Sequence, residues 1–164
     1  MWLRLLRTVS FLGLTAAYFG ALFLCWSLPR LVFGLTEDDF WTVIPRVNVW
    51  QVMLFSAPTL IVGGIAWAVA WWFLLRDSSD ETIAPASQTY LAFFTTLGVV
   101  FTTLIAWREL LICGELSTVQ SRKEAEEIIA GLIGGVFAIL ISACLLGYHG
   151  RLWRRYRRLF QQAP

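Results

Sequence analysis

From Ser121 to Phe160 the chain reads SRKEAEEIIAGLIGGVFAILISACLLGYHGRLWRRYRRLF, and the distribution of charge along this stretch predicts the fold. Glutamates open the stretch, and an uncharged run of 21 residues, Ile128–Tyr148, follows them. As a helix that run is roughly 30 Å long, which matches the hydrocarbon core of a bilayer. Five arginines come next, and arginine-rich flanks stay on the cytoplasmic side. The stretch therefore predicts a transmembrane helix with a cytoplasmic C-terminal flank.

The composition of the whole chain extends this prediction. Hydrophobic residues make up 58% of the sequence and charged residues 15%, whereas a soluble domain carries about a quarter charged residues. The charges cluster, which leaves four apolar spans at about 8–29, 48–75, 84–112 and 128–149. Backbone groups inside lipid must be paired within their own segment, so these spans are expected to be helices. We predict an all-α polytopic membrane protein in which residues 1–164 form one bundle of four transmembrane helices.

The basic residues predict the orientation and the membrane. With both termini in the cytoplasm, eight of the 13 basic residues lie inside and five outside, as the positive-inside rule requires. Arginine outnumbers lysine twelve to one, which is typical of a GC-rich bacterial genome. We therefore expect a multi-pass protein of the bacterial inner membrane with cytoplasmic N- and C-termini.

Two short amphipathic helices are expected at the membrane surface. In the first outer loop, Thr36 is a plausible N-cap, with Glu37, Asp38 and Asp39 in the first turn and an end near Pro45. The alternative is an irregular polar loop. The second is the basic tail, 150–164, whose cationic face would contact anionic lipids rather than nucleic acid. The arginines of this face are Arg151, Arg154, Arg155 and Arg158.

Small residues recur at helical spacing in the spans and predict the surfaces where helices meet. Such ridges let helices approach closely in lipid, where no hydrophobic force drives them together. The most regular ridge lies in the span 128–149. The expected packing residues are Gly131, Gly134, Gly135, Ala138, Ser142, Gly63, Gly64, Gly13 and Ala17.

Threonines in the span 84–112 form two stripes, because residues seven apart lie on nearly the same side of a helix. Thr96 and Thr103 belong to one stripe, and Thr95 and Thr102 belong to the other. A hydrated or ligand-lined groove is one interpretation. Helix packing, in which each hydroxyl bonds its own backbone or a neighbouring helix, is the favoured one.

Charged residues are expected only near the ends of the spans. Arg30, Arg108 and Glu109 lie at the predicted outer boundary, where Glu109 can pair with either arginine. The favoured interpretation is a weak surface ion pair, and the alternative is a gate or docking site.

His149, the only histidine, lies at the inner edge. It is a weak candidate ligand for a metal, haem or a chlorophyll-type pigment, but an exposed interfacial histidine is favoured. We therefore expect no metal and no cofactor.

The residues needed for catalysis do not form a recognisable set. No span carries a charged residue near its centre, and the sequence contains no catalytic triad, metal-ligand spacing or phosphate-binding loop. We therefore expect no enzyme. The favoured function is a non-catalytic accessory or structural subunit of a larger membrane complex, whose partners are other integral membrane subunits. The alternative is a small homo-oligomeric channel or transporter lined by the threonine stripe.

Overall fold

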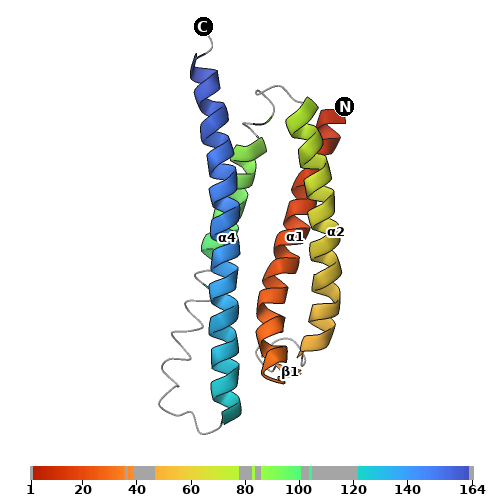
Figure 1. The fold of residues 1–164 in the computed structure, drawn as a ribbon, viewed down its shortest axis with the longest axis vertical. Coiled ribbons are helices and arrows are strands. Elements are labelled where there is room, and N and C mark those ends of the chain that lie inside the picture. Colours follow the sequence, from red (N-terminus) through yellow and green to blue (C-terminus); the bar gives the residue numbers. More distant parts are fainter. Residues whose placement is uncertain are drawn as a thin grey trace.

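Four helical segments dominate the computed structural model, which describes residues 2–35, 37–38, 47–77, 83, 86–100, 104 and 122–162. The long helices are α1 (Trp2–Val32), α2 (Val49–Asp77) and α4 (Arg122–Gln162), and residues 86–100 form a shorter one. Consecutive segments run in opposite directions, so both termini lie at one end of the bundle (Figure 1). We call this the terminal end. The opposite end, where α1 ends and α4 begins, is the loop end.

Three of these helices are long and apolar enough to cross a membrane, namely Trp2–Val32, Val49–Arg76 and Ala125–Arg155. Their outward surfaces carry large apolar side chains. Phe55, Val62 and Leu12, for example, are 76%, 67% and 60% exposed. Such a surface is suited to lipid rather than to water. The predicted helical membrane fold is confirmed to this extent, while the third predicted span, 84–112, is described only at residues 86–100 and 104, which are helical.

The end of α1 is set by a glycine turn rather than by Pro29. The helix continues through Pro29 to Val32, and Gly34 follows with a φ of 73°. The Gly34 N–H donates to the Leu31 carbonyl at 3.0 Å, and the Leu35 N–H donates to the Arg30 carbonyl at 2.9 Å. This pair of bonds is a Schellman motif, which satisfies the last carbonyl groups of the helix.

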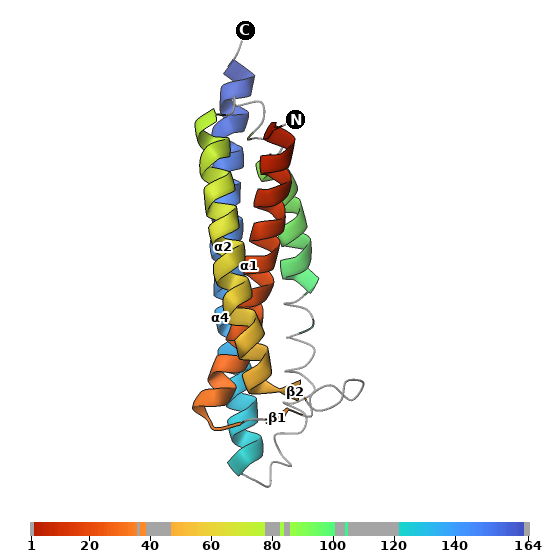
Figure 2. The same cartoon turned by 90° about the vertical axis from the view of Figure 1, so that its right-hand side faces the viewer.

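The described ends of the first loop are extended, so the predicted surface helix is wrong at its start. β1 (Glu37–Asp38) pairs antiparallel with β2 (Val47–Asn48), with Glu37 opposite Asn48 (Figure 2). The hydrogen bonds between the two strands join both ends of the loop, and a helix beginning at Glu37 would not make these bonds. Asn48 then caps α2, because its Oδ1 accepts the Trp50 N–H at 2.9 Å. Thr36 and residues 39–46 lie outside the described residues.

The basic tail is a continuation of α4 and not a separate surface helix. The helix runs unbroken through Gly150 to Gln162, 41 residues in all. At 1.5 Å per residue it is about 60 Å long, roughly twice the thickness of a bilayer core. The sequence of α4 contains no proline, so no proline kink redirects its C-terminal residues toward the membrane surface. Figure 1 shows α4 extending beyond the other helices at the terminal end.

The core lies toward the terminal end. Its buried side chains come from α1, α2 and residues 83–94, and partly buried side chains of α4, such as Ile141 and Leu145, pack against them. α1 packs along α2 and also contacts α4. The buried cluster consists of Leu6, Leu14, Tyr18, Ala70, Trp71, Leu74, Ile83, Ala86, Tyr90 and Phe94.

Candidate functional site

A cluster of rings surrounds His149 near the terminal end. The imidazole is only 1% exposed. Its centroid lies 5.1 Å from the rings of Tyr90 and Tyr148 and 5.6 Å from Trp71, each in an edge-to-face arrangement. We call these four residues the His149 cluster. It joins α2, residues 86–100 and α4 at one level of the bundle.

Two hydrogen bonds tie the His149 cluster to the helices around it. Trp71 Nε1 donates to the Tyr148 hydroxyl at 2.9 Å, which links α2 to α4. The Tyr90 hydroxyl donates to the backbone carbonyl of Arg7 at 3.2 Å, which links residues 86–100 to α1. Neither ring nitrogen of His149 has a hydrogen-bond partner among the described residues. The imidazole therefore acts here as a packed ring.

The burial of His149 corrects the expectation of an exposed interfacial histidine. Arginines flank it in sequence, but its side of α4 faces Trp71 and Tyr90, which offer apolar rings at that level. Trp71 is buried as well, at 3% exposed, while its neighbour Trp72 is 53% exposed. Among the described residues, no three His, Cys, Asp or Glu side chains come together as a metal site would require.

A second polar link lies midway along the bundle. The Tyr18 hydroxyl of α1 and the Ser142 hydroxyl of α4 are 2.7 Å apart. Ser142 also donates to the Ala138 carbonyl at 2.8 Å, so Tyr18 is the donor in the bond between the helices. A tyrosine in an uncharged span needs such a partner, because an unpaired hydroxyl in lipid is costly. That signal could have identified Tyr18 from the sequence.

Glycines bring α1 and α2 into backbone contact. A Cβ atom added at Gly13 would lie 2.7 Å from the Trp67 backbone nitrogen, and one added at Gly63 would lie 2.6 Å from the Ala17 nitrogen. Distances this short leave no room for a side chain. Gly64, in contrast, faces open space. The two members of the Gly63-Gly64 pair therefore differ, and only Gly63 lies at this crossing.

The ridge of small residues on α4 faces α1. A Cβ atom added at Gly134 would lie 3.2 Å from the Cys25 carbonyl carbon. Gly131 is buried, Ala138 is 7% exposed, and Gly135 is half-buried. Ser142 continues the ridge with its bond to Tyr18.

The threonines of residues 86–100 lie on an outward face. Thr95 donates to the Leu91 carbonyl at 2.5 Å and Thr96 to the Ala92 carbonyl at 2.9 Å, so each bonds its own helix. Both side chains are exposed. Thr102 and Thr103 lie outside the described residues.

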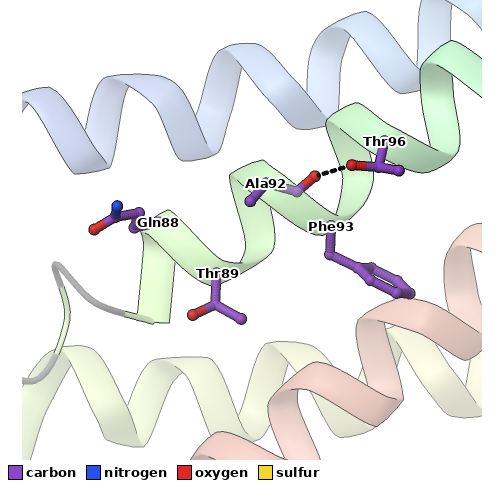
Figure 3. A pocket seen from close by; sticks show the side chains of 5 residues that line it. All are labelled: Gln88, Thr89, Ala92, Phe93 and Thr96. Atoms are coloured by element: carbon purple, nitrogen blue, oxygen red, sulfur yellow. Dashed lines mark hydrogen bonds between the residues drawn. The ribbon is translucent and has the colours of Figure 1, made fainter.

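A shallow groove runs along this face, and we call it the polar groove (Figure 3). Gln88, Thr89, Ala92 and Thr96 are exposed along it. Phe93 forms the remaining wall and packs edge-on against Phe11 of α1, with centroids 4.9 Å apart. The groove is thus fixed to the bundle on one side and open on the other. Its lining residues are Gln88, Thr89, Ala92, Phe93 and Thr96.

Arg30 is buried, which corrects its expected place at the surface. It is 1% exposed, its Nη1 donates to the Trp26 carbonyl at 3.0 Å, and its guanidinium lies 4.5 Å from the centre of the Trp26 ring. Helical side chains point back toward the N-terminus of their helix, which brings Arg30 over Trp26 one turn earlier. Arg108 and Glu109 lie outside the described residues.

Exposed arginines gather at the terminal end. Arg151, Arg154 and Arg155 project from α4, and Arg76 of α2 lies at the same end with its guanidinium 5.3 Å from the centre of the Trp72 ring. The side chain of Arg158 is outside the described part. Cations at this position are suited to anionic headgroups.

The chain matches no protein family, no curated protein and no solved structure. Three features of the described residues combine polar or charged groups: the His149 cluster inside the bundle, the polar groove on its surface, and the exposed arginines at the terminal end.

Proposed function

We propose that this protein is a non-catalytic subunit that holds a larger membrane assembly together. The observation that carries the proposal is the polar groove, which places Gln88, Thr89 and Thr96 on an outward face of a membrane bundle. Acyl chains cannot bond these groups. A neighbouring membrane protein can bond them, and small and polar residues are what helix interfaces in lipid use.

The interior of the bundle supports the same proposal. Two pairs of its polar side chains join helices, through the bond of Tyr18 to Ser142 and the bond of Trp71 to Tyr148. Side chains committed to such bonds are suited to stability rather than to chemistry. On the outward face, the Gln88 amide and the oxygen lone pairs of the Thr95 and Thr96 hydroxyls, whose protons bond their own helix, can accept or donate bonds to another chain.

Gentle extraction followed by native mass spectrometry tests the proposal. The wild-type protein should appear in a complex heavier than one chain with its bound lipid. Thr96→Leu fills the polar groove with an apolar side chain and should reduce that complex to single chains. Val62→Leu is the matched control, because Val62 lies on the lipid-exposed face of α2 and should leave the complex intact. A wild-type protein that is extracted at native expression level as a single chain refutes the proposal.

For the exposed arginines we propose contact with anionic lipid of the bacterial inner membrane. With the terminal end in the cytoplasm, Arg151, Arg154 and Arg155 lie where phosphate headgroups are expected. Arg154→Gln with Arg155→Gln should reduce the number of anionic lipids that remain bound to the purified protein. Arg122→Gln, at the loop end, should not. Equal retention in all three proteins contradicts the assignment.

A homo-oligomeric pore is the second candidate. It is favoured by the outward position of Thr95 and Thr96, which could line a passage between several copies. Thr96→Val should then change solute flux in reconstituted vesicles. Absence of flux with the unmutated protein, or flux that the substitution leaves unchanged, removes this candidate.

A further inference from the structure

Two buried serines near the terminal end do not make the hydrogen bond that several other hydroxyls of the bundle make. Thr15, Thr59 and Ser142 each donate to the carbonyl four residues earlier in their own helix. Ser10 and Ser87, in contrast, are both 0% exposed, and neither hydroxyl has a hydrogen-bond partner among the described residues. Because an unpaired hydroxyl in an apolar interior is costly, each of these serines is expected to have a polar partner that the described residues do not supply.

Tyr90 brings the two serines together. Its hydroxyl donates to the Arg7 carbonyl of α1 at 3.2 Å, and Ser10 lies one turn further along the same side of α1. The Ser10 hydroxyl is near enough to interact with that of Tyr90, although the two do not form a hydrogen bond of good geometry. Ser87 lies one turn before Tyr90, and helical side chains point back toward the N-terminus of their helix, so the Tyr90 ring leans toward Ser87. The three hydroxyls therefore lie at one level between α1 and residues 86–100.

Aromatic rings close the other sides of Tyr90. The centroid of its ring lies 5.5 Å from that of Phe11, 5.4 Å from that of Trp71 and 5.1 Å from that of His149. Tyr90 is 2% exposed as a result. Apolar walls around a small group of polar atoms that otherwise lack partners are the setting in which proteins retain an internal water, and such a water bonds about three of those atoms.

We propose that Ser10, Ser87 and the Tyr90 hydroxyl bind an internal water molecule between α1 and residues 86–100. The Tyr90 hydroxyl gives its proton to the Arg7 carbonyl, so its oxygen is able to accept one proton of the water. The Ser10 oxygen accepts the other proton, and the Ser87 hydroxyl donates to the water oxygen. Each serine then has a partner, and the water joins the two helices beside the direct bond of Tyr90. This inference does not depend on the proposed function.

Water fits these groups better than an ion does. The Tyr90 proton points to the Arg7 carbonyl, so the Tyr90 oxygen presents lone pairs to the site, and lone pairs repel an anion. A cation is disfavoured by the guanidinium of Arg7, which is close enough to interact electrostatically with Tyr90. A water molecule carries no net charge and both donates and accepts hydrogen bonds.

X-ray radiolytic labelling of the full-length protein in lipid nanodiscs tests the inference. An X-ray pulse splits water into hydroxyl radicals, which oxidise the side chains beside which they form, and mass spectrometry measures the oxidation at each residue. Tyr90 should be labelled several times faster than Tyr18, a tyrosine that is equally buried, at 3% exposed, and whose hydroxyl bonds Ser142. Replacing both serines, by Ser10→Ala with Ser87→Ala, should lower the labelling of Tyr90 to that of Tyr18. Ser27→Ala is the matched control, because Ser27 is a buried serine of α1 without a described partner at the loop end, and it should leave Tyr90 labelled.

Three results would overturn the inference. Tyr90 as protected as Tyr18 in the wild-type protein means that the site is dry. Equal labelling of both tyrosines means that water enters the whole interior, and labelling of Tyr90 that the double variant leaves unchanged means that the serines do not hold the water. If the double variant does not fold, the unfolding temperature of Ser10→Ala decides. Removal of a hydroxyl that bonds water should lower that temperature, whereas removal of an unpaired hydroxyl from a dry site should leave it unchanged or raise it, which overturns the inference.

Discussion

Gly13 of α1 and Gly63 of α2 face each other so closely that neither position has room for a side chain. A Cβ atom at Gly63 would lie 2.7 Å from the Gly13 carbonyl oxygen, and one at Gly13 would lie 2.9 Å from the Gly63 carbonyl oxygen. The atoms in the way belong to backbone, which cannot rotate aside. The α1–α2 crossing therefore depends on both residues.

Gly63→Ala is expected to destabilise the protein. The methyl group must push α1 and α2 apart, and overpacking of this kind costs about 1–3 kcal/mol. Gly64→Ala is the matched control, because Gly64 is the next residue of the same helix and faces open space. Thermal unfolding in detergent measures both. A Gly64→Ala variant that is as unstable as Gly63→Ala would show that the loss comes from helix propensity or lipid contact and not from the crossing.

Gly134→Ala is expected to weaken the contact between α4 and α1. A Cβ atom at position 134 would collide with the backbone of Cys25, so α4 must move away from α1 at this point. Gly147→Ala on the same helix is the control, since nothing lies within 4 Å of that position. Protease sensitivity of the loop end, together with the unfolding temperature, reports the change. Equal behaviour of the two variants contradicts the packing described for the ridge.

Tyr18→Phe removes the hydroxyl that donates to Ser142. Interhelical hydrogen bonds in membrane proteins contribute about 0.6 kcal/mol on average, so a loss of about that size is expected. Ser142→Ala should cost a similar amount, and the double variant should cost less than the sum of the two. Unfolding titrations in mixed detergent micelles measure all three proteins. Strictly additive losses would mean that the two side chains do not stabilise each other.

His149→Phe is expected to be tolerated. The imidazole is buried among three rings, and neither nitrogen bonds a described residue, so a phenyl ring keeps the packing and removes two unsatisfied polar atoms. His149→Ala leaves a cavity between α2 and α4, and truncation of a buried ring to alanine costs about 3–5 kcal/mol. Unfolding temperatures compare the variants. If His149→Phe loses as much stability as His149→Ala, the nitrogens must bond a group that this structure does not contain.

The helical membrane fold could be predicted because it depends on local properties. Uncharged runs such as Ile128–Tyr148 must become helices in lipid wherever the rest of the chain lies. The start of α4 at Arg122 likewise agrees with the charged residues that precede the span. Sequence alone was enough for features of this kind.

The burial of His149 could not be predicted, because it depends on residues far away in the sequence. His149 is buried where Trp71 and Tyr90 contact α4, and the sequence near position 149 does not indicate that contact. The strand at Glu37 is a similar case, since it forms only because the chain brings Asn48 opposite Glu37. The outward polar groove had a sequence signal in its threonines, but its direction required the structure.

α4 has a mechanical consequence that follows from its continuity. Because α4 is a single continuous helix of 41 residues, a tilt at one of its ends is transmitted to the other end. A tilt of about 10° in a rod of about 60 Å displaces one end relative to the other by about 10 Å. Movement of the glutamate-rich end of α4 would therefore displace the arginines near its other end, so this helix couples the two ends of the bundle mechanically.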